Sequence, residues 1–347
     1  MRLLRGWWLY GLLAAATVIS YLWLHPVKSP EPFEAVHQLD AQRLEWWPQS
    51  LDQETLQRVL SREPITAVIF SVLMLFALGM MAGGLVLGIR SLLRGDLRSL
   101  WSSSPTPLPS WSLSELLRIV ILALLMMFLL PMAQLTLASM RLMPMPDLHV
   151  GLMVTMLILD LFVGVVILAF AIGKGPSLWQ TFGLSNRQAP AAISAGLRGY
   201  TAAFPWLFAL LFVVAEIMQA LGIHQPIEPI QELVFKEARP GILVLTVLMA
   251  CTIGPVVEEL FFRGVLYTAI RQRTSRLIGM LISSAIFALL HTNLVGFLPI
   301  MGLGCLLAYL YERTGSIAAS LAVHVVHNGF LISMALLFRH LMSAANG

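Results

Sequence analysis

Charged residues are scarce in this sequence. They occupy 12% of its 347 positions, against roughly 25% in a soluble globular domain. The mean hydropathy is correspondingly high, at +0.82. This composition excludes the soluble class and is typical of a protein that crosses a membrane several times. The net charge is only +4, and the basic residues are scattered over short loops. The clustered basic face that a nucleic-acid-binding protein needs is therefore missing.

Cysteine is equally rare, with two residues in the chain, Cys251 and Cys305. Both lie in apolar segments, and they form neither a CxxC pair nor the framework of a disulfide-stabilised domain. The HExxH sequence of many zinc peptidases is also missing. These absences exclude a disulfide scaffold and the best-known helical zinc motif.

Long apolar runs, by contrast, are abundant, and most of them reach the ~20 residues that a helix needs to cross a bilayer core. The sequence therefore predicts an all-α, polytopic transmembrane helix bundle of about eight or nine spans. The eighth run is the shortest, which suggests a tilted or partly re-entrant segment. The predicted spans lie near residues 6–24, 65–90, 115–137, 150–173, 196–221, 241–270, 277–294, 297–311 and 316–338.

The first apolar run follows two arginines, as in a secretory signal. It is longer than the roughly 7–15 residues of a signal core, and no clear small-residue cleavage site follows it. We therefore expect a retained first span. The distribution of lysine and arginine assigns the N-terminus and the turn 271–276 to the cytoplasm. The expected location is the inner membrane of the cell, with a cytoplasmic N-terminus and membrane lipids as surroundings.

A segment rich in proline and serine, 101–113, divides the chain. Residues 1–100 are predicted to form an accessory hairpin of two spans with an acid-rich extracytoplasmic loop at 25–64. Residues 114–347 are predicted to form the core, with its polar motifs between 258 and 328. Three local signals mark helix starts. A capping-box pattern at Ser50–Gln53 precedes a short helix on which Glu54 and Arg58 form an i,i+4 ion pair, and Ser112 to Glu115 caps the third span.

Three polar insertions interrupt the apolar sequence of the C-terminal half, at 258–263, 287–291 and 324–328. Ionisable residues are costly inside a membrane, so they mark functional sites by default. Counted at 1.5 Å per residue from the predicted cytoplasmic turns, their acidic, histidine and asparagine side chains lie ~16–22 Å deep. Three helices would thus bring a carboxylate, two imidazoles and an amide to a similar depth.

The spacing within the insertions indicates separate roles. Glu259 precedes Arg263 by four residues, the favourable order for an ion pair on a helix. Glu258 points about 100° away from Glu259 and is left free to act as a general base. His324 and Asn328 share one helix face and can offer two hydrogen-bond donors to a single oxygen, as an oxyanion hole does.

The pattern E-E-x-x-x-R, F-x-x-x-H and H-x-x-x-N on successive helices resembles the CPBP family of intramembrane proteases. That family includes the CAAX prenyl proteases and the bacteriocin-processing and abortive-infection proteins. The segments Phe182–Leu184 and Thr314–Ile317 also resemble family sequence, and the resemblance covers roughly residues 176–338. The matching motif residues are Glu258, Glu259, Arg263, Phe287, His291, His324 and Asn328.

The resemblance implies an endopeptidase that hydrolyses peptide bonds of membrane-anchored or lipid-modified substrates. It implies that Glu258 with His291 activates the attacking water, and that His324 with Asn328 stabilises the oxyanion. The other motif residues would support the site, namely Glu259, Arg263 and Phe287.

A metal-dependent mechanism is the alternative within this family, with zinc held by Glu258, His291 and His324. We favour the mechanism without a required cofactor, because a single carboxylate cannot easily be both a metal ligand and the base.

Two other functions stay open. A proton-coupled transporter would use Glu258 as a relay, and a non-catalytic immunity or scaffold protein would use the motifs structurally. Three further polar residues are assigned structural roles here. His327 lies off the face of His324, and the lone acids Asp160 and Glu216 are expected to bond to neighbouring helices.

Overall fold

Every regular element in the described part of the computed structural model is a helix, which confirms the all-α prediction. The predicted first span and most of the loop at 25–64 lie outside the described residues, as does most of the linker at 101–113. The accessory hairpin, the division of the chain and the cytoplasmic N-terminus therefore stay predictions. The structure describes residues 53–94, 108–142, 147–185, 188–222, 229–291 and 295–346.

Each predicted span from residue 65 onward corresponds to a helix. Six candidate spans within the described ranges are long and apolar enough to cross a membrane, by length and composition. The helix α14 (Arg276–Leu290) is apolar but shorter, and α15 (Phe297–Thr314) ends in a charged turn. The count of eight or nine spans therefore stays a prediction. The long helices are α4 (Pro64–Arg94), α6 (Leu113–Ser139), α7 (Leu148–Ala171), α9 (Ala189–Ala220), the composite helix Pro240–Arg271 and α16 (Ile317–Asn346).

The composite helix consists of five segments, two of which are π-helical. They are α11 (Pro240–Leu248), η3 (Met249–Ile253), α12 (Gly254–Glu259), η4 (Leu260–Tyr267) and α13 (Thr268–Arg271). Three short helices in the described residues lie outside the spans. They are α3 (Gln53–Arg62), α8 (Leu178–Thr181) and α10 (Pro229–Lys236).

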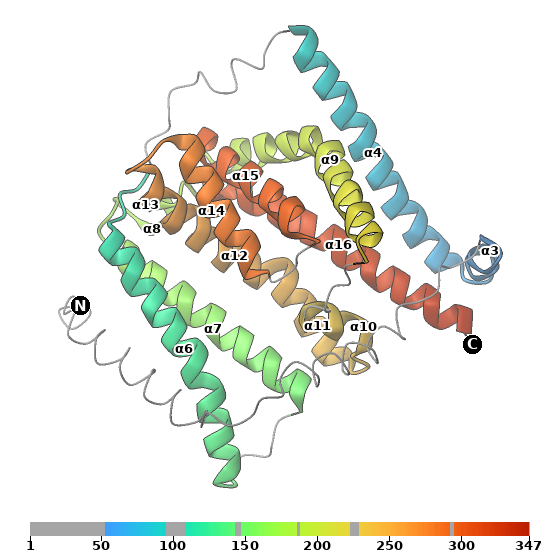
Figure 1. Cartoon of the computed structure of the whole chain (residues 1–347), viewed down its shortest axis with the longest axis horizontal. Coiled ribbons are helices and arrows are strands. Elements are labelled where there is room, and N and C mark those ends of the chain that lie inside the picture. Colours follow the sequence, from blue (N-terminus) through green and yellow to red (C-terminus); the bar gives the residue numbers. More distant parts are fainter. Residues whose placement is uncertain are drawn as a thin grey trace.

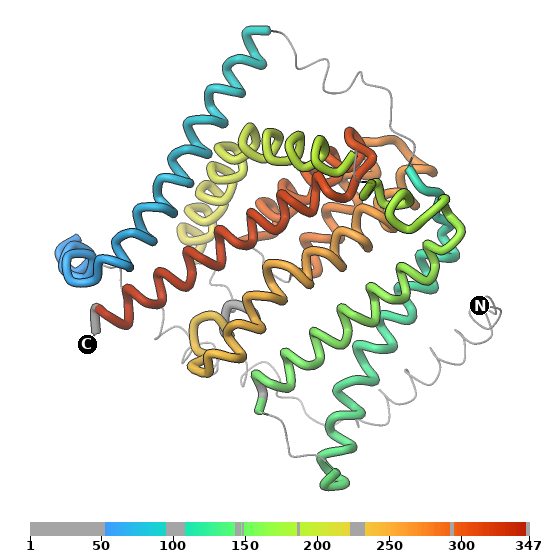
Figure 2. Tube along the Cα trace, turned by 180° about the vertical axis from the view of Figure 1, so that it is seen from behind, coloured from blue at the N-terminus to red at the C-terminus, as the bar shows by residue number. Residues whose placement is uncertain are grey.

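Figures 1 and 2 show how the helices are arranged. Helices α6 and α7 run side by side along one edge of the bundle, and α4 lies at the opposite edge, packed against α9 and α16. Helix α16 runs between α9 and the composite helix and contacts both. Helices α14 and α15 pack against each other and also contact η4. The three predicted polar insertions therefore lie on helices that meet at the centre.

Two helix boundaries differ from the prediction by more than four residues. Helix α9 begins at Ala189 instead of 196. A proline in its first turn fits this start, because the N–H that proline lacks would have no partner within the helix there. It also changes direction along its length (Figure 1), and Pro205 inside it removes a backbone donor, a common cause of such bends. Helix α16 continues beyond 338, where Arg339 donates to the carbonyl of Val234 at 2.7 Å.

Two of the three local helix signals are confirmed, and the capping-box pattern at Ser50–Gln53 begins outside the described residues. The side chain of Ser112 accepts from the backbone N–H of Glu115, whose carboxylate accepts from the Ser112 backbone N–H at 2.8 Å. On α3, Arg58 donates to Glu54 at 3.3 Å.

A turn after α8 is locked onto the start of α16. Gly183 adopts φ +67°, and a Cβ at this position would lie 2.1 Å from the carbonyl oxygen of Gly315. The backbone N–H of Ile317 donates to the carbonyl of Phe182 at 3.0 Å, and the hydroxyl of Ser316 donates to the carbonyl of Gly183. These contacts join the two flanking segments, 182–184 and 314–317, that resemble family sequence.

A buried carboxylate that the sequence analysis did not single out joins the helices at the same end. Glu312 of α15 is 4% exposed. It accepts a 2.6 Å hydrogen bond from the hydroxyl of Tyr267 and lies 3.3 Å and 3.1 Å from the guanidinium groups of Arg271 and Arg276. The composite helix, α14 and α15 are thereby tied together at this end of the bundle.

Candidate active site

The two adjacent acids of the first insertion lie at the end of α12, with π-helical turns before and after them. Single π-helical turns within α-helices are rare and occur frequently at functional sites. They leave backbone groups out of the regular i to i−4 pattern and shift the faces of the helix. The sequence analysis treated this span as a regular α-helix, so the π-helical turns are a feature that it missed.

Glu259 is fully buried and bridges two helices. Its Oε1 lies 2.9 Å from the guanidinium of Arg263, as the i,i+4 spacing predicts. The same oxygen lies 2.9 Å from Nδ1 of His324 on α16. Arg263 is 2% exposed and its guanidinium stacks over the ring of Phe287, 4.5 Å from the ring centroid. Glu259 therefore holds both its own helix and the histidine of the third insertion.

The bond to Glu259 fixes the tautomer of His324. A carboxylate can only accept, so Nδ1 of His324 carries the proton and its Nε2 points the other way. That Nε2 lies 3.6 Å from Oε2 of Glu258. The side chain of Glu258 is 34% exposed, whereas that of Glu259 has no exposed surface. The two acids thus have different environments, as their predicted 100° separation requires.

Phe287 places the second insertion against the third. Its ring is 1% exposed and lies edge-on to both His291 and His324, at centroid distances of 4.6 and 5.8 Å. His291 ends α14, and its Nδ1 lies 2.8 Å from the carbonyl oxygen of Phe287. Since a carbonyl only accepts, Nδ1 carries a proton and Nε2 keeps the lone pair in the neutral ring.

Asn328 lies one turn beyond His324 on α16 and donates from its amide nitrogen to the carbonyl of Ala250 at 2.9 Å. Ala250 belongs to the π-helical turn η3, so this bond joins the third insertion to the composite helix. No sequence pattern indicates this hydrogen bond, because the accepting group is a backbone carbonyl.

The structure brings together the side chains of Glu258, Glu259, Arg263, Phe287 and His324. His291 reaches the group through Phe287, and Asn328 through the backbone of Ala250. His327 lies elsewhere, with its Nδ1 2.9 Å from the hydroxyl of Tyr200 on α9, which accords with a structural role.

The lone acid Asp160 on α7 differs from expectation. Within the residues that the structure describes, it makes no hydrogen bond or ion pair to a neighbouring helix. The charged group that acts on it is Glu258.

The predicted zinc ligands do not form a three-ligand site in this arrangement. Glu258 and His324 place two ligand atoms 3.6 Å apart. His291 does not complete the set, because in the described part of the chain only one group has three ligand atoms within 4.8 Å of one another, and it lies elsewhere. A zinc ion with three protein ligands does not fit the present geometry of Glu258, His291 and His324.

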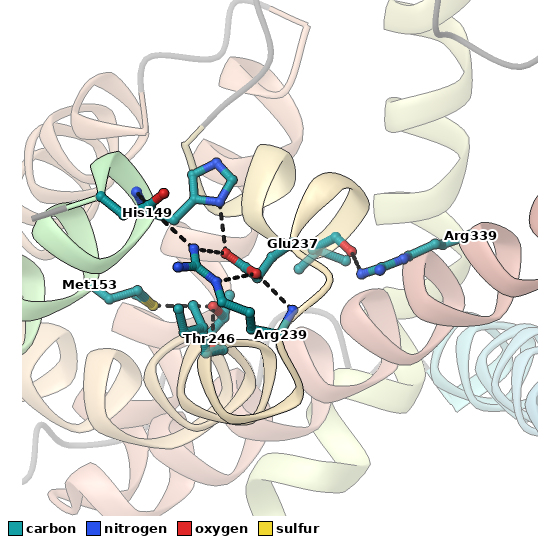
Figure 3. Close-up of polar contacts among 9 residues, drawn as sticks. His149, Met153, Glu237, Arg239, Thr246 and Arg339 are labelled. Carbon is teal, nitrogen blue, oxygen red and sulfur yellow. Dashed lines mark hydrogen bonds and ion pairs between the residues drawn. The ribbon is translucent and has the colours of Figure 1, made fainter.

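That other group lies between the start of α7 and the chain before α11, and consists of Asp147, His149 and Glu237. Figure 3 shows Arg239 and His149 converging on Glu237. Arg239 donates to Glu237 at 2.6 and 2.8 Å and to Asp147 at 2.8 Å. These bonds hold the pKa of both carboxyl groups below their usual values. The guanidinium already supplies the positive charge that a cation would bring.

Comparison with known proteins supports the family read from the motifs. Residues 240–330, which contain all three insertions, match the family model described as type II CAAX prenyl endopeptidase Rce1-like. The chain is 33% identical over 92 residues to YdiL of Bacillus subtilis (strain 168), a protein named as a candidate membrane peptidase. That match covers 26% of this chain and 38% of the relative.

The chain is also 30% identical over 147 residues to the membrane-embedded CAAX protease MroQ of Staphylococcus aureus (strain USA300). This match covers 38% of the chain and 58% of the relative. The matches thus span about half the length of these relatives. No solved structure matches the chain. The resemblance to the CPBP family is confirmed, and with six candidate spans the findings support a multi-pass membrane protein.

Proposed function

We propose that this protein, whose residues 240–330 carry the CAAX-type domain of the CPBP family, is an intramembrane endopeptidase that uses a glutamate-activated water. The observation that carries the proposal is the relation of three side chains. Glu258 faces Nε2 of His324, and Glu259 holds Nδ1 of the same imidazole. A partly exposed carboxylate thus lies beside a histidine that is fixed in one orientation, inside a bundle of candidate membrane spans.

Glu258 is the general base of the proposed reaction. Its Oε2 is buried and has no hydrogen-bond partner in the described residues. A buried acceptor of this kind requires a donor, and the attacking water is the donor that we assign. His291 would assist Glu258 in activating this water through Nε2, since its Nδ1 is occupied by the carbonyl of Phe287.

His324 and Asn328 stabilise the oxyanion in this proposal. With Nδ1 donating to Glu259, Nε2 can donate only when the ring is an imidazolium. Asn328 has two amide N–H groups, one of which donates to Ala250. The other is the donor that we assign to the oxyanion.

Glu258 takes up and returns the same proton during the proposed reaction. The water oxygen forms a bond to the scissile carbonyl carbon while Glu258 takes its proton, and the carbonyl oxygen becomes the oxyanion. Glu258 then returns that proton to the amide nitrogen as the carbon–nitrogen bond breaks. The products are a carboxylate and an amine, and the enzyme is regenerated.

The substrates that we propose are membrane-embedded or lipid-modified peptides, because the site lies on helices of spanning length and apolarity. The type II CAAX prenyl endopeptidase model and the name of the staphylococcal relative favour a peptide with a lipidated C-terminal end.

The test compares wild-type protein with two variants, Glu258→Gln and Glu259→Gln. Membranes from cells that express Glu258→Gln should accumulate uncleaved precursors, which proteomics would identify. Purified wild-type protein should cleave a fluorogenic prenylated peptide in isotopically labelled water and leave one labelled oxygen in the new carboxyl group. Retained cleavage by folded Glu258→Gln would exclude Glu258 as the base.

Two further results would redirect the proposal. A cleavage rate that a chelator abolishes and zinc restores would assign a metal-dependent mechanism. Solute flux driven by a pH gradient, with no cleavage product in membranes or in the purified reaction, would favour a transporter.

A further inference from the structure

Helix α7 runs parallel to the composite helix in a constant register. The hydroxyl of Thr246 lies 3.1 Å from the sulfur of Met153, a contact that Figure 3 shows. Farther along, a Cβ on Gly164 would lie 3.5 Å from Cγ2 of Val257. The partners are separated by 93 residues in the first contact, and their numbers give the same separation in the second.

This register places Asp160 opposite the end of η3. Asp160 lies one turn before Gly164 and therefore shares its face of α7. The separation of 93 residues pairs it with Ile253, next to Gly254. Glu258 reaches back to this level, because side chains on a helix point toward its N-terminus. Its Oε1 lies 3.7 Å from the Cβ position of Gly254.

The electrostatic surroundings agree with this placement. Asp160 is partly buried, and Glu258 is the ionisable group within electrostatic range of it among the described residues. Glu259 and Arg263, on the same composite helix, contact α16 and α14 instead and neutralise each other at 2.9 Å. The remaining ionisable side chains on elements packed against α7 are Cys251 on η3, Tyr267 on η4, and Glu115 and Arg118 on α6. An acid inside a span that lacks a bonded partner among the described residues is a functional candidate.

We propose that Asp160 is a further catalytic residue, which faces Glu258 across the site and binds the attacking water together with it. This inference rests on the proposed function, because it takes Glu258 as the base. A water molecule has two hydrogens. Glu258 removes one of them, and Asp160 accepts a hydrogen bond from the other. Two carboxylates repel each other in a low dielectric, and a water that donates to both is a stable arrangement between them.

Asp160 therefore fixes the position of the water while Glu258 moves its proton. Removing this hydrogen bond should lower kcat and leave KM unchanged, because Asp160 contacts the water and not the peptide. A displacement of reacting groups by about 1 Å costs on the order of 10²-fold in rate, and we expect a loss of that size for Asp160→Leu, which has a similar size and no acceptor. Asp160→Glu keeps the acceptor and should recover part of the rate.

The first test does not depend on proteolysis. In a full-length background with Cys251→Ala and Cys305→Ala, single variants Asp160→Cys and Glu258→Cys are treated with a charged, water-soluble methanethiosulfonate. Leu161→Cys is the matched control, because Leu161 neighbours Asp160 on α7 and is 54% exposed on the outer face. Asp160→Cys should react at a rate similar to Glu258→Cys, and both should react faster than the control. Reaction of Asp160→Cys only as slow as that of the control would overturn the proposal.

The second test uses the fluorogenic prenylated peptide. A lower kcat for Asp160→Leu at unchanged KM and unchanged thermal stability, with partial recovery in Asp160→Glu, supports the role. An unchanged kcat overturns it. If wild-type protein cleaves no peptide, the proposed function fails, and thiol labelling still decides whether Asp160 faces the same hydrated site as Glu258.

Discussion

Oε1 of Glu259 lies 2.9 Å from Nδ1 of His324 and equally close to the guanidinium of Arg263, so one buried oxygen joins two helices. The sequence predicted the bond to Arg263 from the i,i+4 spacing. The bond to His324 connects residues 65 positions apart, and no local pattern indicates it. Glu259 is thus a structural and an orienting residue at once.

The substitution Glu259→Gln should destabilise the protein strongly. It leaves the guanidinium of Arg263 buried without its counter-charge, and breaking such a buried pair costs about 3–5 kcal/mol. The measurement is the thermal unfolding midpoint of the purified protein. The matched variant is Glu258→Gln, whose side chain is partly exposed and makes no ion pair shorter than 3.6 Å. Its midpoint should stay close to that of wild type, and equal midpoints for both variants would contradict the division of roles.

The substitution Gly183→Ala should destabilise the protein more than Gly173→Ala. Both glycines have a positive φ, +67° and +83°, which costs an alanine roughly 1–2 kcal/mol. Only at Gly183 would the added Cβ also meet a carbonyl oxygen, that of Gly315, whereas nothing lies within 4 Å of the Cβ position at Gly173. Comparison of the two unfolding midpoints isolates the steric contribution. A larger loss for Gly173→Ala would argue against the contact between the 183 turn and α16.

The substitution Glu312→Gln should also lower stability, on the order of 3 kcal/mol, because the buried carboxylate is the shared partner of Arg271 and Arg276. Tyr267→Phe removes one hydrogen bond to the same group and should cost only about 1 kcal/mol. Thermal unfolding of both variants tests the ranking. A smaller effect for Glu312→Gln than for Tyr267→Phe would contradict the role assigned to this carboxylate.

Acid should weaken the contact between the start of α7 and the chain before α11. Hydrogen bonds from Arg239 lower the folded-state pKa of Glu237 from its usual 4.5. A lowered pKa contributes stability that is present above the unfolded-state pKa and is lost as the pH falls below it. We expect Arg239→Gln to lower the unfolding midpoint at pH 7, and its difference from wild type to shrink below about pH 4.5. A difference that is constant with pH would exclude this ion-pair contribution.

The sequence predicted the helices well because apolar runs and caps are local signals. The capping box of Ser112 and Glu115 and the pair of Glu54 and Arg58 are both confirmed. It could not predict the π-helical turns, which depend on how the composite helix packs. Nor could it predict the contact of Asn328 with a carbonyl of η3, or the register of α7 that places Asp160 opposite the end of η3. These join residues on separate helices and have no characteristic spacing.

The wide turns on either side of α12 make the length of the composite helix critical. A residue deleted between 249 and 253 would rotate everything after it by about 100° around the axis. The side chain of Glu258 would then point toward lipid or the core instead of the site. Glu259 would no longer reach the imidazole of His324. A one-residue deletion here should abolish assembly of the site even if the shortened segment still crosses the bilayer, whereas a conservative substitution in the same turn should be tolerated.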